Sequence, residues 1–110
     1  MSEYDLYLKE IILMIERIQN STNNYTKESF SKNIDLIDAT LMRLHFIGET
    51  IKSIPYNLKK NNKEVRWKRY SKLRDIIGHK YSQINLNIIW DVVQNLTELD
   101  NQLKQILDKS

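Results

Sequence analysis

The sequence predicts an all-α protein in which four main helices form one antiparallel bundle, with short extra turns in the connectors. Only two glycines and one proline occur in 110 residues, which argues against a turn-rich β domain and for long helices. Apolar residues recur at helical spacing in long segments near both ends of the chain and in its middle. The length suits one domain with one core, and we assign residues 1–110 to it.

The first helix is predicted from an apolar stripe near the start of the chain: Tyr7, Ile11, Met14, Ile15 and Ile18. The polar residues 20–24 end this helix and form a loop. A second helix is expected to begin at Thr26 or later and to run to Ile54, where Pro55 stops it.

The second helix is apolar on more than one side. Its predicted core face consists of Ile34, Ile37, Leu41, Leu44, Gly48 and Ile51. Met42, Phe46 and Ile47 lie off that face, so the helix is either central in the bundle or also buried against a partner chain. Glycine inside a helix costs about 1 kcal/mol relative to alanine, so we expect another helix to approach closely at Gly48.

The second half of the chain predicts two further helices. Residues 56–63 are polar and rich in lysine, and they form a connector with at most a short turn of helix. A third helix carries Val65, Trp67, Tyr70 and Leu73, and residues 81–87 connect it to the last helix, for which Asn85 is a suitable N-cap. The last helix has a stripe at helical spacing: Ile88, Val92, Leu96, Leu99, Leu103 and Ile106. Trp90 points away from this stripe, and we expect it to contact a partner surface or a ligand.

Composition excludes several classes of protein. Without cysteine there is neither a disulfide framework nor a thiolate metal site, which suits a reducing compartment. Two histidines without a metal-binding spacing argue against a zinc enzyme, and we expect neither a metal nor a cofactor. No apolar run is long enough for a membrane span, and the acidic start of the sequence is unlike a signal peptide. We therefore expect a cytoplasmic protein.

Positive charge is concentrated in one segment. Residues 59–80 contain nine lysines and arginines against Glu64 and Asp75, a net +7 in a chain whose total is only +3. Such a block is typical of a surface that binds a polyanion, although a solvated helix face is an equally common explanation on composition alone.

The densest part of this basic segment closes with Arg74, and His79 and Tyr81 follow it. Arginine can bind two phosphate oxygens at once, and histidine can transfer protons near neutral pH. On an unbroken helix, however, Arg74 and His79 lie about 140° apart around the axis. They can share one phosphate only if the helix loosens between them, for example at Gly78, or if a second copy of the chain completes the site.

This spacing resembles the Arg-x4-His-x-Tyr signature of the HEPN superfamily, specifically its HepT-like ribonuclease toxins. Further similar segments are Arg43-Leu44 with Ile47-Gly48-Glu49, Trp67 shortly before the motif, and Ile84-Asn85 with Trp90. The resemblance covers roughly residues 34–107 and implies a HEPN-like helical domain. Asp75 departs from the family pattern, which more often has asparagine after the arginine, and Asn85 stands where aspartate is common.

The resemblance implies a metal-independent endoribonuclease, the toxin of a toxin–antitoxin pair, with its motifs facing a shared cleft in a homodimer. Arg74 and His79 are then the catalytic residues, and Tyr81 is the residue to which a nucleotidyltransferase antitoxin transfers AMP. Asp75 and Glu49 are candidate supporting residues. Candidate contacts to the RNA backbone are Lys68, Arg69, Lys72 and Lys80.

Other assignments remain open from the sequence. The motif can serve binding alone, in a non-catalytic helical dimer that binds a nucleotidyltransferase partner or a nucleotide. A purely structural dimeric bundle is a third alternative. His45 lies on the second helix near Asp38 and Glu49, where a salt-bridged or solvated edge is a better explanation than a metal site.

Overall fold

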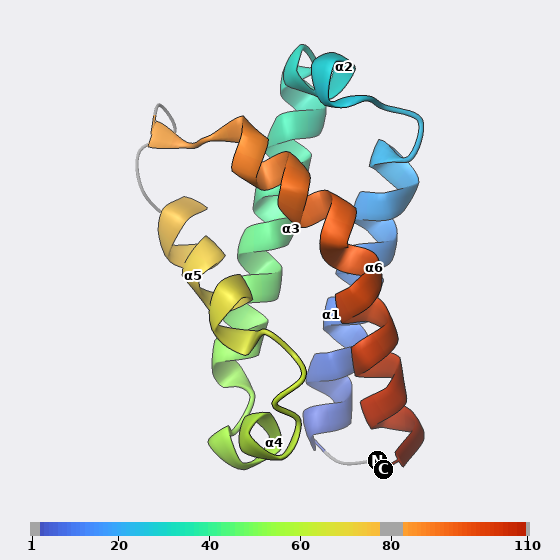
Figure 1. Cartoon of the computed structure of the whole chain (residues 1–110), viewed down its shortest axis with the longest axis vertical. Helices are drawn as coiled ribbons and strands as arrows, with labels where there is room; N and C mark the ends of the chain where they lie inside the picture. The colour runs from blue at the N-terminus through green and yellow to red at the C-terminus, as the bar shows by residue number, and fades with distance from the viewer. Residues whose placement is uncertain (1–2, 78–82, 110) are drawn as a thin grey trace.

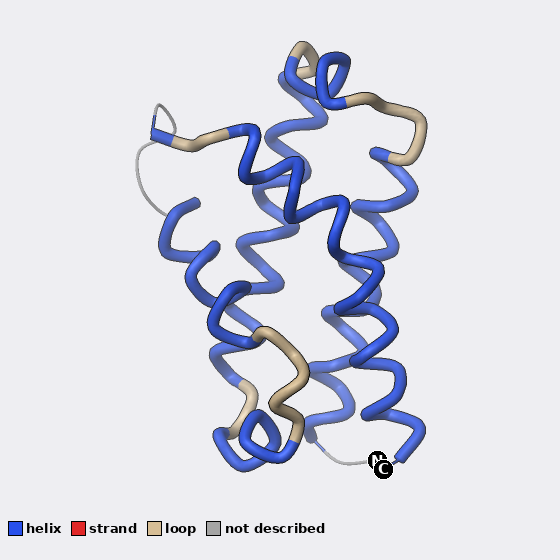
Figure 2. The backbone as a smooth tube through the Cα atoms, viewed as in Figure 1, coloured by secondary structure: helices blue, strands red, loops and turns tan. Residues whose placement is uncertain are grey.

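The computed structural model describes residues 3–77 and 83–109, and in these ranges it contains helices and loops but no strand (Figure 2). The helices in chain order are α1 (Glu3–Thr22), α2 (Lys27–Ser31), α3 (Ile34–Ser53), α4 (Tyr56–Asn61), α5 (Trp67–Ile77) and α6 (Leu86–Lys109). This confirms the predicted all-α class. None of the helices in the described part of the chain combines the length and apolar character of a membrane span.

The four longer helices run up and down as an antiparallel bundle, with α1 and α6 on one side and α3 and α5 on the other (Figure 1). The start of α1 and the end of α6 lie at the same end of this bundle. The two short helices occupy opposite ends, α2 between α1 and α3, and α4 between α3 and α5. The connector predicted at residues 56–63 thus contains one short helix, α4.

The predicted second helix is in fact two helices. Thr26 caps α2 through a reciprocal pair of hydrogen bonds with Ser29, and α2 ends after five residues. Asn33 then caps α3, because its Oδ1 accepts a hydrogen bond of 3.0 Å from the backbone N–H of Leu36. A side chain that bonds the backbone in this way favours the start of a new helix over continuation of the old one. At the other end, α3 stops at Ser53, two residues before Pro55, as expected.

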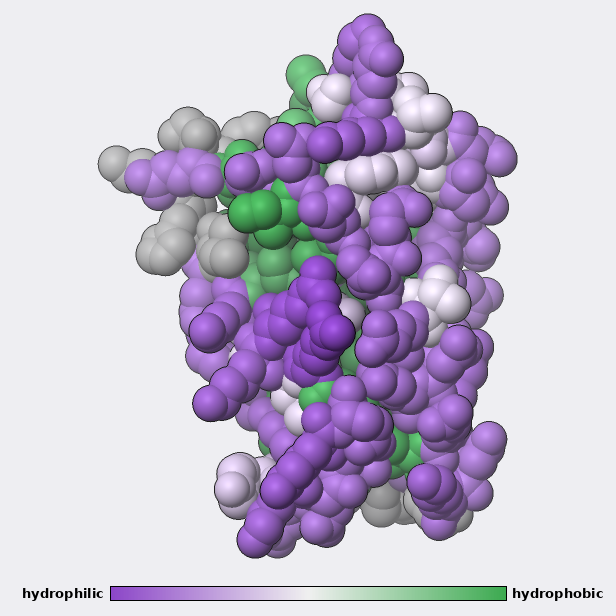
Figure 3. Space-filling model, viewed as in Figure 1, coloured by the Kyte–Doolittle hydropathy of each residue, from purple (hydrophilic) through white to green (hydrophobic). Residues whose placement is uncertain are grey.

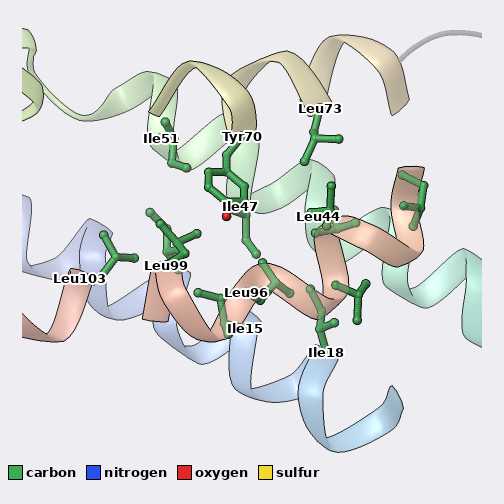
Figure 4. Packing of buried hydrophobic residues seen from close by; sticks show 14 of the residues in the cluster. Ile15, Ile18, Leu44, Ile47, Ile51, Tyr70, Leu73, Leu96, Leu99 and Leu103 are labelled. Carbon is green, nitrogen blue, oxygen red and sulfur yellow. The ribbon is translucent and has the colours of Figure 1, made fainter. Parts of the chain in front are cut away.

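Side chains from all four long helices meet in one core (Figure 4). Ile15 and Ile18 of α1 lie beside Leu96 of α6, and Ile47 and Ile51 of α3 face Tyr70 of α5. Burial raises the pKa of the Tyr70 hydroxyl, as expected for a phenol that loses contact with water. The core therefore joins α3 and α5, the two helices that carry the candidate site.

Two predicted core stripes were wrong at their first residues. Ile34 is 67% exposed and Ile88 is 47% exposed, whereas Leu36 and Ile89 are buried in their place. Both misplaced residues lie in the first turn of their helix, where the neighbouring helices no longer cover the predicted face. The remaining positions of the two stripes are buried as expected.

Trp90 does not need another molecule for a contact. Its ring packs on Phe30 of α2, with ring centroids 5.1 Å apart and a tilt of 40° between the planes. The expectation of a partner surface or ligand at Trp90 is therefore replaced by an aromatic contact within the chain. Helical periodicity places the indole off the main stripe correctly, but it cannot show that a short helix covers that side.

Candidate functional site

The candidate site is built where α3 crosses α5 at Gly48. A Cβ atom added to Gly48 would lie 2.5 Å from the Cβ of Arg74 and 3.0 Å from the backbone oxygen of Tyr70. Real Cβ atoms essentially never approach so closely, so only glycine permits this distance between the two helices. The predicted close approach at Gly48 is confirmed, and it places the motif arginine directly against α3.

Arg74 is oriented by two carboxylates. Its Nε donates a hydrogen bond of 2.7 Å to Oε1 of Glu49 on α3, and its Nη1 donates one of 3.1 Å to Oδ1 of Asp75. The hydrogen bond and charge of Arg74 lower the pKa of Glu49, and Glu49 in turn raises the pKa of Arg74. Among the described residues no partner bonds Nη2, so this amino group is available to a phosphate oxygen.

His45 extends this cluster by one turn of α3. Its Nε2 lies 3.8 Å from Oε1 of Glu49, and the charge of His45 contributes to the lowered pKa of Glu49. This contact matches the salt-bridged edge expected for His45. Within the described ranges, no group of three or more histidine, aspartate or glutamate residues is arranged to hold a metal ion.

Part of the motif segment lies outside the described residues: His79, Lys80 and Tyr81, together with Gly78, at which we expected the helix to loosen. Of the predicted site residues, the structure brings together Arg74, Glu49 and Asp75. The distance between Arg74 and His79 stays a prediction.

The predicted RNA contacts on α5 lie on one side of the helix, away from Arg74. Lys68 and Lys72 are exposed and Arg69 is partly buried. Counting 100° per residue, these three residues lie within about 100° of one another and about 120–160° around the axis from Arg74. Sequence reasoning also omitted Lys52, whose charge helps to lower the pKa of Glu49 from its place one turn further along α3. Its spacing of three residues from Glu49 was the available signal.

An apolar hollow lies beside the end of α5. It measures about 820 Å³ and is lined mainly by aliphatic residues of α3, the last residue of α5 and the segment that enters α6. Figure 3 shows apolar residues gathered between α5 and the first turns of α6, while the lower part of the same view is mostly hydrophilic. The candidate site thus has an apolar border at the end of α5.

The sequence matches the model of the family described as Ribonuclease HepT-like over residues 11–106. A gamma-glutamylcyclotransferase and candidate RNase of Methanocaldococcus jannaschii is 30% identical over 105 residues, which are 94% of this chain and 47% of that protein. The chain therefore spans about half the length of this relative. No solved structure matches the chain.

Two further relatives are matched over most of their own length. A candidate RNase of Caldanaerobacter subterraneus subsp. tengcongensis is 32% identical over 104 residues, covering 94% of this chain and 93% of the relative. A protein of Thermococcus cleftensis named as a probable ribonuclease HepT is 30% identical over 88 residues, 80% of each chain.

Proposed function

The chain belongs to the HepT-like ribonuclease family, and from this membership we propose that it is a metal-independent endoribonuclease that uses Arg74 and His79. The single observation that supports the role of Arg74 most strongly is its hydrogen bond to Glu49 at the crossing of α3 and α5. This bond occupies Nε and, together with the bond from Nη1 to Asp75, holds the guanidinium in one orientation. A group held in one orientation before the substrate arrives loses little entropy in the reaction.

In the proposed reaction, the ribose 2′-oxygen attacks the adjacent phosphorus and the bond from phosphorus to the 5′-oxygen breaks. The products are a 2′,3′-cyclic phosphate and a 5′-hydroxyl. One group must take the proton from the 2′-hydroxyl and another must give a proton to the departing oxygen. We assign proton transfer to His79, and Arg74 stabilises the negative charge on the pentavalent phosphorus.

Two proton transfers with one motif histidine per chain favour a site shared by two copies. The exposed face of α3 supports this arrangement, because Met42 is 69% exposed and Phe46 is 40% exposed. By helical counting, His45 and Glu49 lie on this same face. A second copy that covers the face would bury these apolar side chains and bring two Arg74 clusters close together.

We further propose that the protein is the toxin of a toxin–antitoxin pair, and that a nucleotidyltransferase antitoxin transfers AMP to Tyr81. The support is the resemblance of the motif together with simple electrostatics. A bulky anion two residues from His79 would block the site and repel the RNA backbone. The Tyr81→Phe variant should cleave RNA yet escape this inhibition, and loss of cleavage in that variant would instead assign Tyr81 to the reaction.

The experiment that tests the ribonuclease proposal compares cleavage of one defined RNA with and without EDTA. The proposal requires cleavage in both, products with a 2′,3′-cyclic phosphate, and no cleavage of the same sequence with deoxyribose at the cut site. If the protein binds RNA but cleaves none of it, the non-catalytic module that binds a nucleotidyltransferase or a nucleotide becomes the better assignment. If cleavage stops with EDTA, the metal-independent mechanism is wrong.

A further inference from the structure

α4 and the start of α5 lie at the same end of the bundle (Figure 1). Residues of α4 and the first half of α5 line another hollow. It measures about 630 Å³, within the usual range for small-ligand sites. Its lining combines four lysines, two aromatic residues and a serine: Lys59, Lys60, Lys63, Lys68, Tyr56, Trp67 and Ser71. We call it the α4–α5 pocket. No acidic residue is among the described residues that line it.

No carboxylate of the described residues pairs with the charges of the pocket, since none of its four lysines lies within salt-bridge distance of one. Partial burial lowers the pKa of Lys59, and the charge of Lys52 lowers it further. Clustered ammonium groups without counter-ions in a hollow produce a field that attracts anions such as phosphate groups.

The aromatic residues of the pocket have different roles. Trp67 is buried and held in place, because its Nε1 donates a hydrogen bond of 3.0 Å to the backbone oxygen of Asn62. Asn62 also fixes the end of α4, since its Nδ2 donates to the backbone oxygen of Leu58 at 2.8 Å. Tyr56, at the first position of α4, is 74% exposed. The pocket therefore has a fixed inner wall and an open aromatic ring at its edge, which is suited to stacking with a base.

The pocket and the site around Arg74 share helix α5. Trp67 and Arg74 are seven residues apart, so they lie within about 20° around the axis and about 10 Å along it. The charge of Lys52 lowers the pKa of both Glu49 beside Arg74 and Lys59 in the pocket. A strand bound at Arg74 needs to extend only about 10 Å along α5 to reach the pocket.

We propose that the α4–α5 pocket is a subsite for single-stranded RNA, in which one base stacks on Tyr56 and the lysines bind neighbouring phosphates. The identity of the strand rests on the proposed function, whereas the pocket itself rests on its lining. Stacking accepts any base, so this subsite adds affinity and positions the strand without selecting a sequence. A free nucleotide offers the same base and phosphates, but it would not span the distance from the pocket to Arg74.

The test is a fluorescence titration of the whole chain with a short 2′-O-methyl RNA that contains the fluorescent base 2-aminopurine. This RNA has no free 2′-hydroxyl, so binding is measured without cleavage. Tyr56→Ala should weaken binding about 10-fold or more and remove the quenching of 2-aminopurine, since stacking is lost. Tyr56→Phe keeps an aromatic ring and should bind within about twofold of the unmodified chain. Tyr4→Ala, which removes an exposed tyrosine on α1, is the matched control and should change nothing.

The outcomes separate this inference from the proposed function. One outcome is that the unmodified chain cleaves RNA while the Tyr56→Ala variant and the unmodified chain bind the oligonucleotide with equal affinity. In that case the subsite is wrong and the ribonuclease proposal stands. If the unmodified chain cleaves no RNA while Tyr56→Ala still weakens binding, the subsite stands and the ribonuclease proposal fails. If ATP binding depends on Tyr56 and oligonucleotide binding does not, the pocket is a nucleotide site and this inference is overturned.

Discussion

Glu49 contacts two side chains, Arg74 on α5 and His45 on α3. Because Arg74 lowers its pKa, the carboxylate stays ionised at pH values where an ordinary glutamate would begin to take up a proton. The contact with Arg74 is therefore present above the ordinary pKa of glutamate. It is lost as the pH falls through the lowered pKa of the folded state.

Glu49→Gln should reduce the rate of cleavage by about 10-fold while leaving RNA affinity unchanged or slightly higher. The rate falls because the neutral amide holds Nε of Arg74 more weakly than the carboxylate does. The affinity does not fall, because the substitution removes a negative charge that repels RNA. Single-turnover rates and separate binding constants distinguish the two effects. Glu10→Gln, at an exposed position of α1, is the control. A fall in affinity without a fall in rate would mean that Glu49 does not orient Arg74 for the reaction.

At the scale of helices, the contact between α3 and α5 depends on Gly48. Gly48→Ala should destabilise the fold by about 1–3 kcal/mol, because the new methyl group meets a Cβ and a backbone oxygen and neither can move freely. This cost outweighs the gain of about 1 kcal/mol that alanine brings inside a helix. Urea unfolding measures the change in the free energy of unfolding, with Gln105→Ala at an exposed position of α6 as the control. A more stable Gly48→Ala variant would contradict the close crossing.

The lining of the α4–α5 pocket leads to a prediction about salt. Lys68 lines the pocket and Lys72 does not, although the two lie only about 40° apart around α5. If the strand enters the pocket, Lys68→Gln should reduce the slope of log affinity against log salt by about 1. Lys72→Gln should change the slope less, although both substitutions remove one charge. Equal effects would mean that the strand is not directed into the pocket or that only overall charge matters.

Helical periodicity predicts the four main helices and most of the core, because buried positions repeat along each helix. It fails at Ile34 and Ile88, which are exposed, and it does not predict that Trp90 packs on Phe30 of α2. The break between α2 and α3 was visible only as Asn33, a residue that caps helices but also occurs within them.

The candidate site was only partly predictable. Glu49 and Arg74 are far apart in the sequence, so neither periodicity nor composition pairs them, and the family resemblance alone suggested the contact that the structure contains. The α4–α5 pocket was not predicted, because Tyr56 and Trp67 belong to different helices and their spacing follows no motif. Only the folded chain brings the lysines of the connector around these rings.

For the whole molecule, the exposed apolar face of α3 predicts a homodimer. Phe46→Asp places a charge on this face next to His45 and should shift the protein to a monomer in sedimentation at micromolar concentration. Cleavage should fall with dimer content, since each active site is proposed to need two chains. Leu6→Asp, which charges an exposed apolar residue on α1, is the control and should leave the assembly unchanged. A monomeric Phe46→Asp variant with full activity would contradict the shared site.

The most direct test of the central claim is the single-turnover cleavage rate of the Arg74→Ala variant on one defined RNA in EDTA, with binding measured separately. Because the guanidinium is proposed to stabilise charge in the transition state, the rate should fall by a factor on the order of 10² or more. RNA binding should fall far less, since many other lysines and arginines remain. Arg17→Ala, at an exposed position of α1, should behave like the unmodified chain. Cleavage by Arg74→Ala at the unmodified rate would contradict the assignment of Arg74 and the site built around it.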